Sequence, residues 1–269
     1  MALKNVLVHL DQDERTSERL KLAVAIAKEH GARLVGVFAQ RSRAMRVGVV
    51  TSWPTPEFTQ ACEHSKNLFA AATTALAQAE WRFVNRGSHG EILRVFTDIA
   101  RHSDLVIMGQ HEHGKESVHD DLTSEVLVGC GRPVLIIPYV GTFDTVGKCP
   151  LIAWNNAPEA ARALNDALPL MQGCELAHLL SIAARQEDGE ASCTEVERHL
   201  GTHGIAIRPD VFVVQDFGIM DMVLNRASDR GADLLVMGAH ANMGFPFESR
   251  GTGTRYILQH MTLPVLMAN

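Results

Sequence analysis

The sequence predicts an α/β protein made of two tandem Rossmann-like or flavodoxin-like domains, each with a five-stranded parallel sheet flanked by helices. Three observations carry this prediction. The segments SDLVIMGQH (103–111) and ADLLVMGAH (232–240) nearly repeat one another. Apolar runs of strand length alternate with helix-period segments in the same order on both sides of the chain's midpoint. A length of 269 residues suits two domains of about 100–150 residues each.

The first half begins with a strand, a helix and a second strand. The apolar run 5–11 is followed by 16–31, in which apolar residues recur at helical spacing up to Gly31, and by the apolar run 32–40. This order predicts a right-handed crossover between parallel strands. A third strand (81–85), a helix (91–102), the repeated strand (103–111), a further helix and a proline-led strand (132–139) complete the copy.

The second half repeats these elements. Predicted strands at 149–156, 174–183, 210–215, 232–240 and 263–269 match those of the first half, and helices are expected at 157–173, with Pro158 in the first turn, and at 219–231. The expected domains are residues 1–140 and 148–269, with residues 140–148 as the linker. The first half carries additional residues between 41 and 69, expected to form a surface excursion or a lid.

Composition limits the classes of partner. A content of 46% hydrophobic and 21% charged residues is typical of a soluble globular protein. A net charge of −6 argues against nucleic-acid and anionic-membrane partners, and no apolar run reaches the roughly 20 residues that cross a bilayer. The opening residues show no signal-peptide pattern, and five dispersed cysteines without a CxxC motif indicate reduced thiols in the cytoplasm. A small ligand or a protein partner is expected.

A glycine-threonine cluster lies where such sheets bind ligands. In an open parallel sheet, ligands bind beyond the carboxyl ends of the strands, near the first and fourth strands. Gly251, Thr252, Gly253 and Thr254 fall at the start of the last expected helix, where backbone N–H groups and the helix dipole favour a phosphate. The alternative is an ordinary helix cap with turn glycines.

The wider spacing around this cluster resembles the C-terminal signature of the universal stress protein family, a G-2x-G-9x-G-S/T loop that binds ATP. Gly238 matches the first glycine, Ala241 replaces the second, and Gly251 and Thr252 follow at the family spacing. The segments VLVHLDQDE and LIAWNNAPEAARALNDALPL also resemble the family's first strand and helix. Because the likeness covers both halves, the chain resembles a tandem universal stress protein.

The resemblance implies a 3-2-1-4-5 strand order and adenosine bound near the end of the first strand. The family's aspartate at that place corresponds to Asp11 in the first half and to Asn155 in the second. The implied ATP or ADP site of the second half comprises Ala153, Asn155, Ser181, Ile182, Met237, Gly238, His240, Ala241, Gly251, Thr252, Gly253 and Thr254. Single-domain members pair through their last strands, so the two halves are expected to form an intramolecular pseudo-dimer.

The first half is expected to lack this phosphate site. When the two halves are aligned without gaps back from their last strands, Asp120 and Asp121 stand opposite Gly251 and Thr252. Two carboxylates at a helix N-terminus accept hydrogen bonds from its free N–H groups and repel a phosphate. At most one nucleotide per chain is therefore predicted. The loop that contains residues 111–119 is rich in histidine, but its spacing matches no standard metal site, and no metal is expected.

The leading functional hypothesis is a nucleotide-dependent sensor or regulator in stress response. The sequence shows neither a Walker lysine nor a Ser-His-Asp arrangement, which are features that would indicate fast catalysis. At most slow ATP hydrolysis is therefore expected. The alternative is a scaffold or adaptor that binds a protein partner or an apolar ligand without nucleotide. A flavoprotein of similar fold is a third hypothesis, which rests on fold analogy alone.

Overall fold

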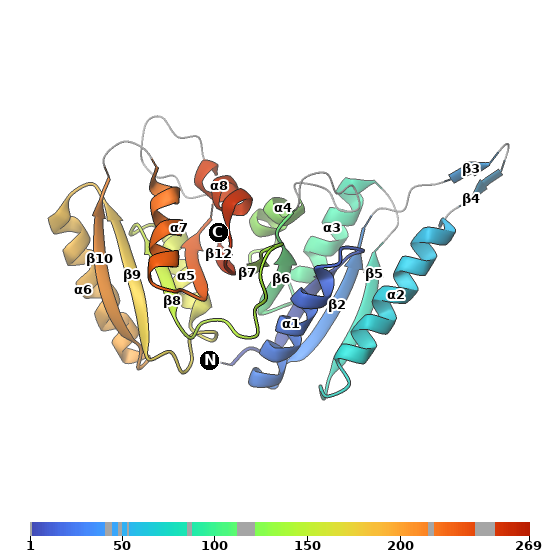
Figure 1. Ribbon diagram of the computed structural model, residues 1–269, viewed down its shortest axis with the longest axis horizontal. Helices are drawn as coiled ribbons and strands as arrows, with labels where there is room; N and C mark the ends of the chain where they lie inside the picture. The colour runs from blue at the N-terminus through green and yellow to red at the C-terminus, as the bar shows by residue number, and fades with distance from the viewer. Residues whose placement is uncertain are drawn as a thin grey trace. The chain divides into compact units, whose positions relative to one another are not determined.

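The fold is α/β, as predicted, and divides into two compact units, residues Ala2–Arg132 and Pro133–Asn269. The computed structural model describes residues 2–40, 45–47, 50–52, 54–84, 88–111, 122–214, 218–239 and 251–269. Figure 1 shows the elements with their labels. Within the described ranges, no helix has the length and apolar character that crossing a membrane would require.

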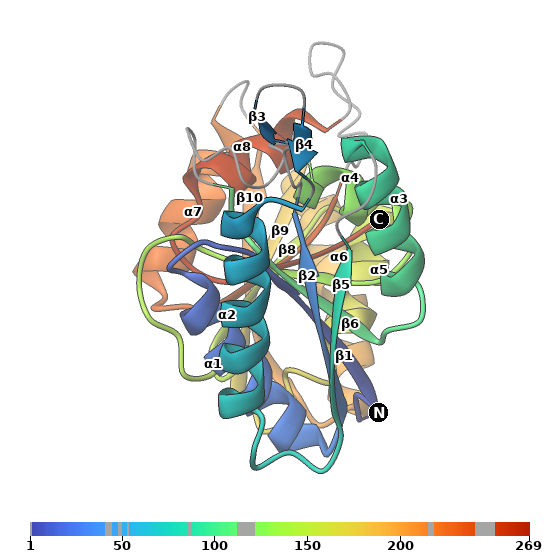
Figure 2. The same ribbon diagram turned by 90° about the vertical axis from the view of Figure 1, so that its right-hand side faces the viewer.

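The first unit is a parallel sheet between two pairs of helices. Its strands run in the order β5-β2-β1-β6, with bounds β1 (Asn5–Leu10), β2 (Arg33–Ala39), β5 (Ala79–Val84) and β6 (Leu105–Gly109). Its helices are α1 (Thr16–His30), α2 (Pro56–Ala72), α3 (His89–Ala100) and α4 (Leu122–Gly129). Helices α1 and α2 cover one face of the sheet, and α3 and α4 cover the other (Figure 2). The first helix ends where the sequence predicts, because Gly31 adopts the left-handed cap conformation with φ 60°.

The segment expected to be a surface excursion contains a regular helix. A short antiparallel pair, β3 (Met45–Val47) and β4 (Val50–Ser52), is followed by α2, which has the same length as α6 of the second unit. Phe58 and Phe69 of α2 are buried, and a Cβ at Gly36 of β2 would lie 2.5 Å from the Phe69 ring. The excursion prediction was therefore wrong for residues 56–69, because their apolar face packs on β2 as part of the repeated fold.

The second unit contains the second copy and one further strand. Its strand order is β10-β9-β8-β11-β12-β7, with bounds β7 (Val134–Ile137), β8 (Pro150–Trp154), β9 (Leu176–Ala183), β10 (Ala206–Val213), β11 (Leu234–Gly238) and β12 (Val265–Ala268). Its helices are α5 (Pro158–Ala167), α6 (Gln186–Thr202), α7 (Ile219–Asp229) and α8 (Thr252–His260). The order β10-β9-β8-β11-β12 is the predicted 3-2-1-4-5. Helix α5 stops earlier than predicted because Pro169 cannot continue a helix.

The last strand of the first half pairs with the last strand of the second. Strand β7 runs antiparallel to β12, with Val265 opposite Ile136 and Met267 opposite Val134. All four side chains are fully buried. The first unit retains the strands β5-β2-β1-β6, which are in the predicted order 3-2-1-4.

Candidate functional site

The carboxyl ends of β8, β9 and β11 bring several predicted site residues to one edge of the second sheet. Ala153 of β8 lies opposite Met237 of β11 and Leu180 of β9. Paired residues of parallel strands share a face, and side chains alternate along a strand, so Ile182 lies on the same face as Ala153 and Met237. These three side chains and the end of β8 form the floor of the candidate site.

Ser181 lies on the opposite face of the sheet. It pairs with Trp154, and both side chains contact α6: the Trp154 Nε1–H donates to the Ser192 Oγ at 2.7 Å, and the Cys193 thiol is hydrogen-bonded to Ser181. Ser181 is only 2% exposed. Its hydroxyl therefore holds α6 to the sheet and lies on the face away from Ala153.

Asn155 shapes the turn between β8 and α5. Its Oδ1 accepts a hydrogen bond from the Ala157 N–H at 3.3 Å, and Asn156 adopts a left-handed φ of 57°. Pro158 occupies the first turn of α5, as predicted, where a missing N–H is harmless. The Asn155 amide group thus uses its oxygen locally and keeps its Nδ2 donors for another partner.

Gly238 is the last residue of β11, and the close packing of α5 against it leaves no room for a side chain. A Cβ at this position would lie 2.7 Å from the Ala160 N and 2.8 Å from the Glu159 Cβ, both in the first turn of α5. A larger residue would push α5 away from the sheet. This close approach explains the glycine without any ligand.

The glycine-threonine cluster begins α8, as predicted. Gly251 is the N-cap, with a left-handed φ of 89°, and having no side chain it cannot cap the first turn. Thr252 is exposed, Thr254 is buried, and a Cβ at Gly253 would lie 3.0 Å from the Met220 Cε of α7. Because the chain leaves the carboxyl end of β11 and returns into α8, this helix start lies at the same edge as Ala153. The predicted site residues His240 and Ala241 lie outside the described residues.

The corresponding edge of the first unit holds a buried charged network that the sequence reasoning missed. The Arg19 Nε–H donates to the His9 carbonyl at 2.8 Å, and its Nη2 donates to the Asp11 Oδ2 at 3.0 Å and to the Thr16 Oγ1 at 3.1 Å. The Thr16 hydroxyl also donates to Asp11. A Cβ at Gly109, the counterpart of Gly238, would collide with the Arg19 Nη1. An arginine side chain therefore fills the space beside the end of β6.

Burial and neighbouring charges shift the pKa values of His9 and Asp11. Burial alone would raise the pKa of Asp11, but Arg19, His9 and the Thr16 hydrogen bond together outweigh it, and the pKa lies below its ordinary value. Burial lowers the pKa of His9, with Asp11 opposing that shift. The His9 ring is held by a 2.9 Å hydrogen bond from its Nε2–H to the Ala39 carbonyl. The network is thus an Asp11–Arg19 ion pair with the His9 Nδ1 3.5 Å from the Asp11 Oδ2.

A comparison of the two repeats could have identified Arg19 as an unusual residue from the sequence. Aligning Asp11 with Asn155 sets Arg19, eight positions later, opposite Ala163, which is fully buried in α5. The first half thus has a cation where the second has a methyl group.

The described residues include no cluster of three or more histidine, cysteine, aspartate or glutamate side chains that could hold a metal ion. The histidine-rich residues 112–119 fall outside those ranges. All five cysteines are free thiols, and three of them, Cys130, Cys174 and Cys193, are buried.

The fold is similar to that of solved universal stress proteins. A universal stress protein from Archaeoglobus fulgidus DSM 4304 superposes with a TM-score of 0.74 at 18% identity, over 98% of this chain and 96% of the other. A functionally unknown protein, PA1789 from Pseudomonas aeruginosa PAO1, gives a TM-score of 0.61 at 17% identity over 99% and 92%. A universal stress protein from Archaeoglobus fulgidus solved in complex with dAMP matches 51% of this chain and 98% of its own, at 15% identity and a TM-score of 0.35. No family model and no curated protein matches the chain. The chain therefore has the fold of a universal stress protein, with two copies of it in tandem.

Proposed function

We propose that the chain is a tandem universal stress protein that binds ATP or ADP at the carboxyl edge of the second unit's sheet. One comparison within the chain supports this proposal most. Arg19 fills the space beside Gly109 at the edge of the first unit, whereas its counterpart in the second unit is Ala163, and among the described residues of the second unit no lysine or arginine is buried. Gly251, which cannot cap α8 with a side chain, starts that helix at the same edge.

The residues of the proposed site would take distinct parts of the nucleotide. Adenine and ribose would lie against Ala153 and Ile182, beyond Ser181 of the same strand, with a donor from the Asn155 amide. The phosphates would lie at the start of α8, where the first-turn N–H groups and the helix dipole favour an anion. The full proposed set is Ala153, Asn155, Ser181, Ile182, Met237, Gly238, His240, Ala241, Gly251, Thr252, Gly253 and Thr254.

The biological role proposed is that of a sensor or regulator in stress response, with at most slow ATP hydrolysis. The β7–β12 pair supports an arrangement of the two halves as an intramolecular pseudo-dimer, since both strands are apolar and buried where they pair. Five free thiols, each with a pKa raised by burial, favour residence in the cytoplasm.

The decisive experiment identifies the ligand that the protein carries. The full chain is purified without added nucleotide and denatured, and the released small molecules are identified by mass. Calorimetry with ATP and ADP then gives affinity and stoichiometry. Release of an adenine nucleotide, or saturable binding of ATP or ADP, supports the proposal. A folded protein that releases none, and whose melting temperature does not rise with millimolar ATP, would rule it out.

The competing proposal is an adaptor without nucleotide. It is favoured by Gly238, whose close contact with α5 makes it a packing glycine, and by Ala241 at the position of the motif's second glycine. The same calorimetric titration separates the two proposals.

A further inference from the structure

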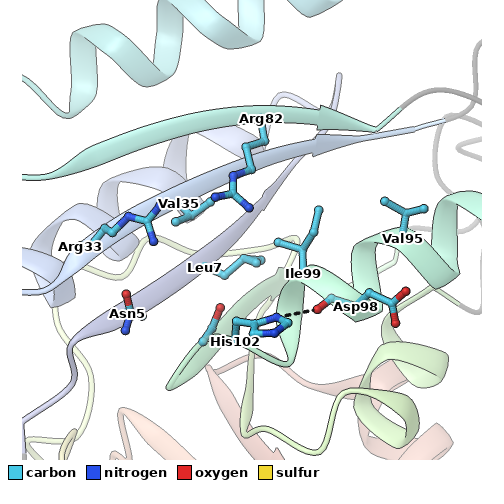
Figure 3. Close-up of a pocket in the computed structure, with 10 residues that line it drawn as sticks. Asn5, Leu7, Arg33, Val35, Arg82, Val95, Asp98, Ile99 and His102 are labelled. Carbon is cyan, nitrogen blue, oxygen red and sulfur yellow. Dashed lines mark hydrogen bonds between the residues drawn. The ribbon is translucent and has the colours of Figure 1, made fainter.

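The first unit has a pocket away from the carboxyl edge of its sheet. It has a volume of about 450 Å³ and lies between α3 and the strands β1, β2 and β5 (Figure 3). Asn5 and Arg33, which line it, are the first residues of β1 and β2, so the pocket opens toward the amino ends of these strands. Pockets that hold small molecules in proteins have volumes of about 300–1,000 Å³.

The floor of this pocket is apolar and two of its walls carry arginines. Leu7 and Val35 of the sheet face Ile99 of α3, and the guanidinium groups of Arg33 and Arg82 lie over the strands on either side of Val35 (Figure 3). Both arginine side chains are more than one third exposed, at 35% and 41%. The pocket thus combines an apolar surface with two cations that solvent can reach.

The two guanidinium groups already hold one carboxylate together. Glu80 of β5 accepts from the Arg82 Nε at 2.5 Å and from the Arg33 Nη2. Each guanidinium has five N–H donors, so these bonds leave further donors on both groups. One carboxylate between two cations also leaves a net positive charge.

The acid on the helix side of the pocket is neutralised by other cations. Asp98 of α3 accepts from Arg101 at 2.6 Å and from Arg94 at 3.3 Å. The His102 Nδ1–H donates to the Asp98 carbonyl at 3.0 Å, which fixes that ring along the wall (Figure 3). The positive charge of Arg33 and Arg82 is therefore not cancelled from the helix side.

The second unit has internal ion pairs at the equivalent place. The strand registers of the two sheets place Asp210 of β10 at the position that Arg82 occupies in β5. When the buried residues of α3 and α7 are aligned with each other, Arg226 of α7 corresponds to Ile99 of α3. The Asp210 Oδ2 lies 3.5 Å from the Arg226 Nε and 3.6 Å from the Arg230 Nη2. The first unit instead has Arg33 and Arg82 on its strands and the apolar Ile99 on its helix. This arrangement is suited to the binding of an anionic ligand.

We propose that this pocket binds a small organic carboxylate, which accepts from the N–H donors that Glu80 leaves unused on Arg33 and Arg82 and lays an apolar body on Leu7, Val35 and Ile99. Guanidinium groups favour carboxylates because their planar forks match the two oxygens. The apolar floor adds affinity only for an anion with an apolar part. Inorganic phosphate would use the arginines and leave the floor unused.

The test is an NMR titration of the full chain, labelled with ¹⁵N, with benzoate as the probe. Benzyl alcohol, which keeps the ring and lacks the charge, and inorganic phosphate, which keeps the charge and lacks the ring, are titrated alongside. Benzoate is expected to shift amides of β2, β5 and α3 in a saturable manner and to bind at least about tenfold more tightly than either comparison ligand.

Two variants and one control locate the site. Arg33→Gln and Arg82→Gln should each raise the benzoate Kd about tenfold, because each removes charge-assisted donors from a side chain that is more than one third exposed. Arg208→Gln, the same change on an exposed strand residue of the second unit at the position matching Glu80, should leave the Kd unchanged. Circular dichroism verifies that each variant is folded.

Three outcomes would overturn the proposal: benzoate that shifts no amides of these elements, equal affinity for phosphate or benzyl alcohol, or an unchanged Kd in both folded variants. Nucleotide binding by the second unit is measured on the same variants and should be unchanged. The two proposals therefore fail independently.

Discussion

The Arg19 Nη2 lies 3.0 Å from the Asp11 Oδ2, and both side chains are buried, at 4% and 9% exposure. The pair lies at the carboxyl edge of the first unit's sheet, at the positions that correspond to Ala163 and Asn155 of the second. One chain thus contains two versions of the same edge, one filled by an internal ion pair and one without it.

Replacing Arg19 with alanine should destabilise the first unit strongly. The change leaves Asp11 buried without its cation, and breaking a buried pair in this way costs about 3–5 kcal/mol. Urea denaturation measures the loss. The matched control is Arg162→Ala, which removes an exposed partner of Asp166 on α5 and should cost less than about 1 kcal/mol. Equal losses in the two variants would show that the buried pair has no special weight.

The free energy of unfolding should fall as the pH drops below neutrality, and the protonation of His9 should be one cause of this loss. The pKa of His9 is lowered in the folded protein, so below its ordinary value of about 6.5 the unfolded chain binds more protons, and the free energy of unfolding decreases until the folded pKa is reached. Asp11 adds a second loss of stability at more acid pH, because its pKa is lower in the folded protein than in the unfolded chain. The ionised Asp11 stabilises the fold fully at pH values above its unfolded pKa, and this stabilisation is lost as the pH falls through its folded pKa.

The variant His9→Gln separates these two contributions. It should have a shallower loss of stability between pH 7 and pH 5 than the unchanged protein, measured by urea denaturation at each pH. The loss below about pH 4 should persist in this variant because Asp11 is still present. Identical slopes between pH 7 and pH 5 would contradict the role of His9.

Calorimetry should find one ATP per chain. The Arg19 side chain occupies the space beside Gly109, and Asp11 is committed to that arginine, so the first unit offers neither the room nor the carboxylate. Asp120 and Asp121, which the sequence places at the equivalent phosphate position, lie outside the described residues and lead to the same prediction. Two equivalent sites would contradict it.

Replacing Gly251 with aspartate should weaken ATP binding by more than about tenfold. A carboxylate at the N-cap accepts from the first turn of α8 and repels phosphate, and aspartate is among the residues that tolerate a left-handed φ. The matched control is Gly204→Asp, since Gly204 also has a positive φ, 74°, with open space around it, but lies before β10 at the other edge of the sheet. A folded Gly251→Asp variant with unchanged affinity would place the nucleotide elsewhere.

Much of the fold could be read from local pattern. Helix α1 ends at Gly31 as predicted, because a glycine cap is encoded in a few neighbouring residues. The strands β6 and β11 fall within the two near-identical segments that first indicated a repeat. Helix α6 and the helical part of residues 41–69 were not predicted, because mostly polar or proline-containing segments show little periodicity until the sheet gives them a face to cover.

The sequence by itself determined the tandem α/β architecture and the start of α8 at Gly251, since periodicity, caps and repeated segments are local properties of the chain. The strand order was expected only from the resemblance to the universal stress protein family. Only the tertiary structure decided which side chains meet. Ser181 faces α6 because alternation along β9 turns it away from Ala153, and Arg19 reaches Asp11 because one turn of α1 passes over the end of β1. Neither contact is visible in a linear motif, because each depends on the direction of a side chain in the packed sheet.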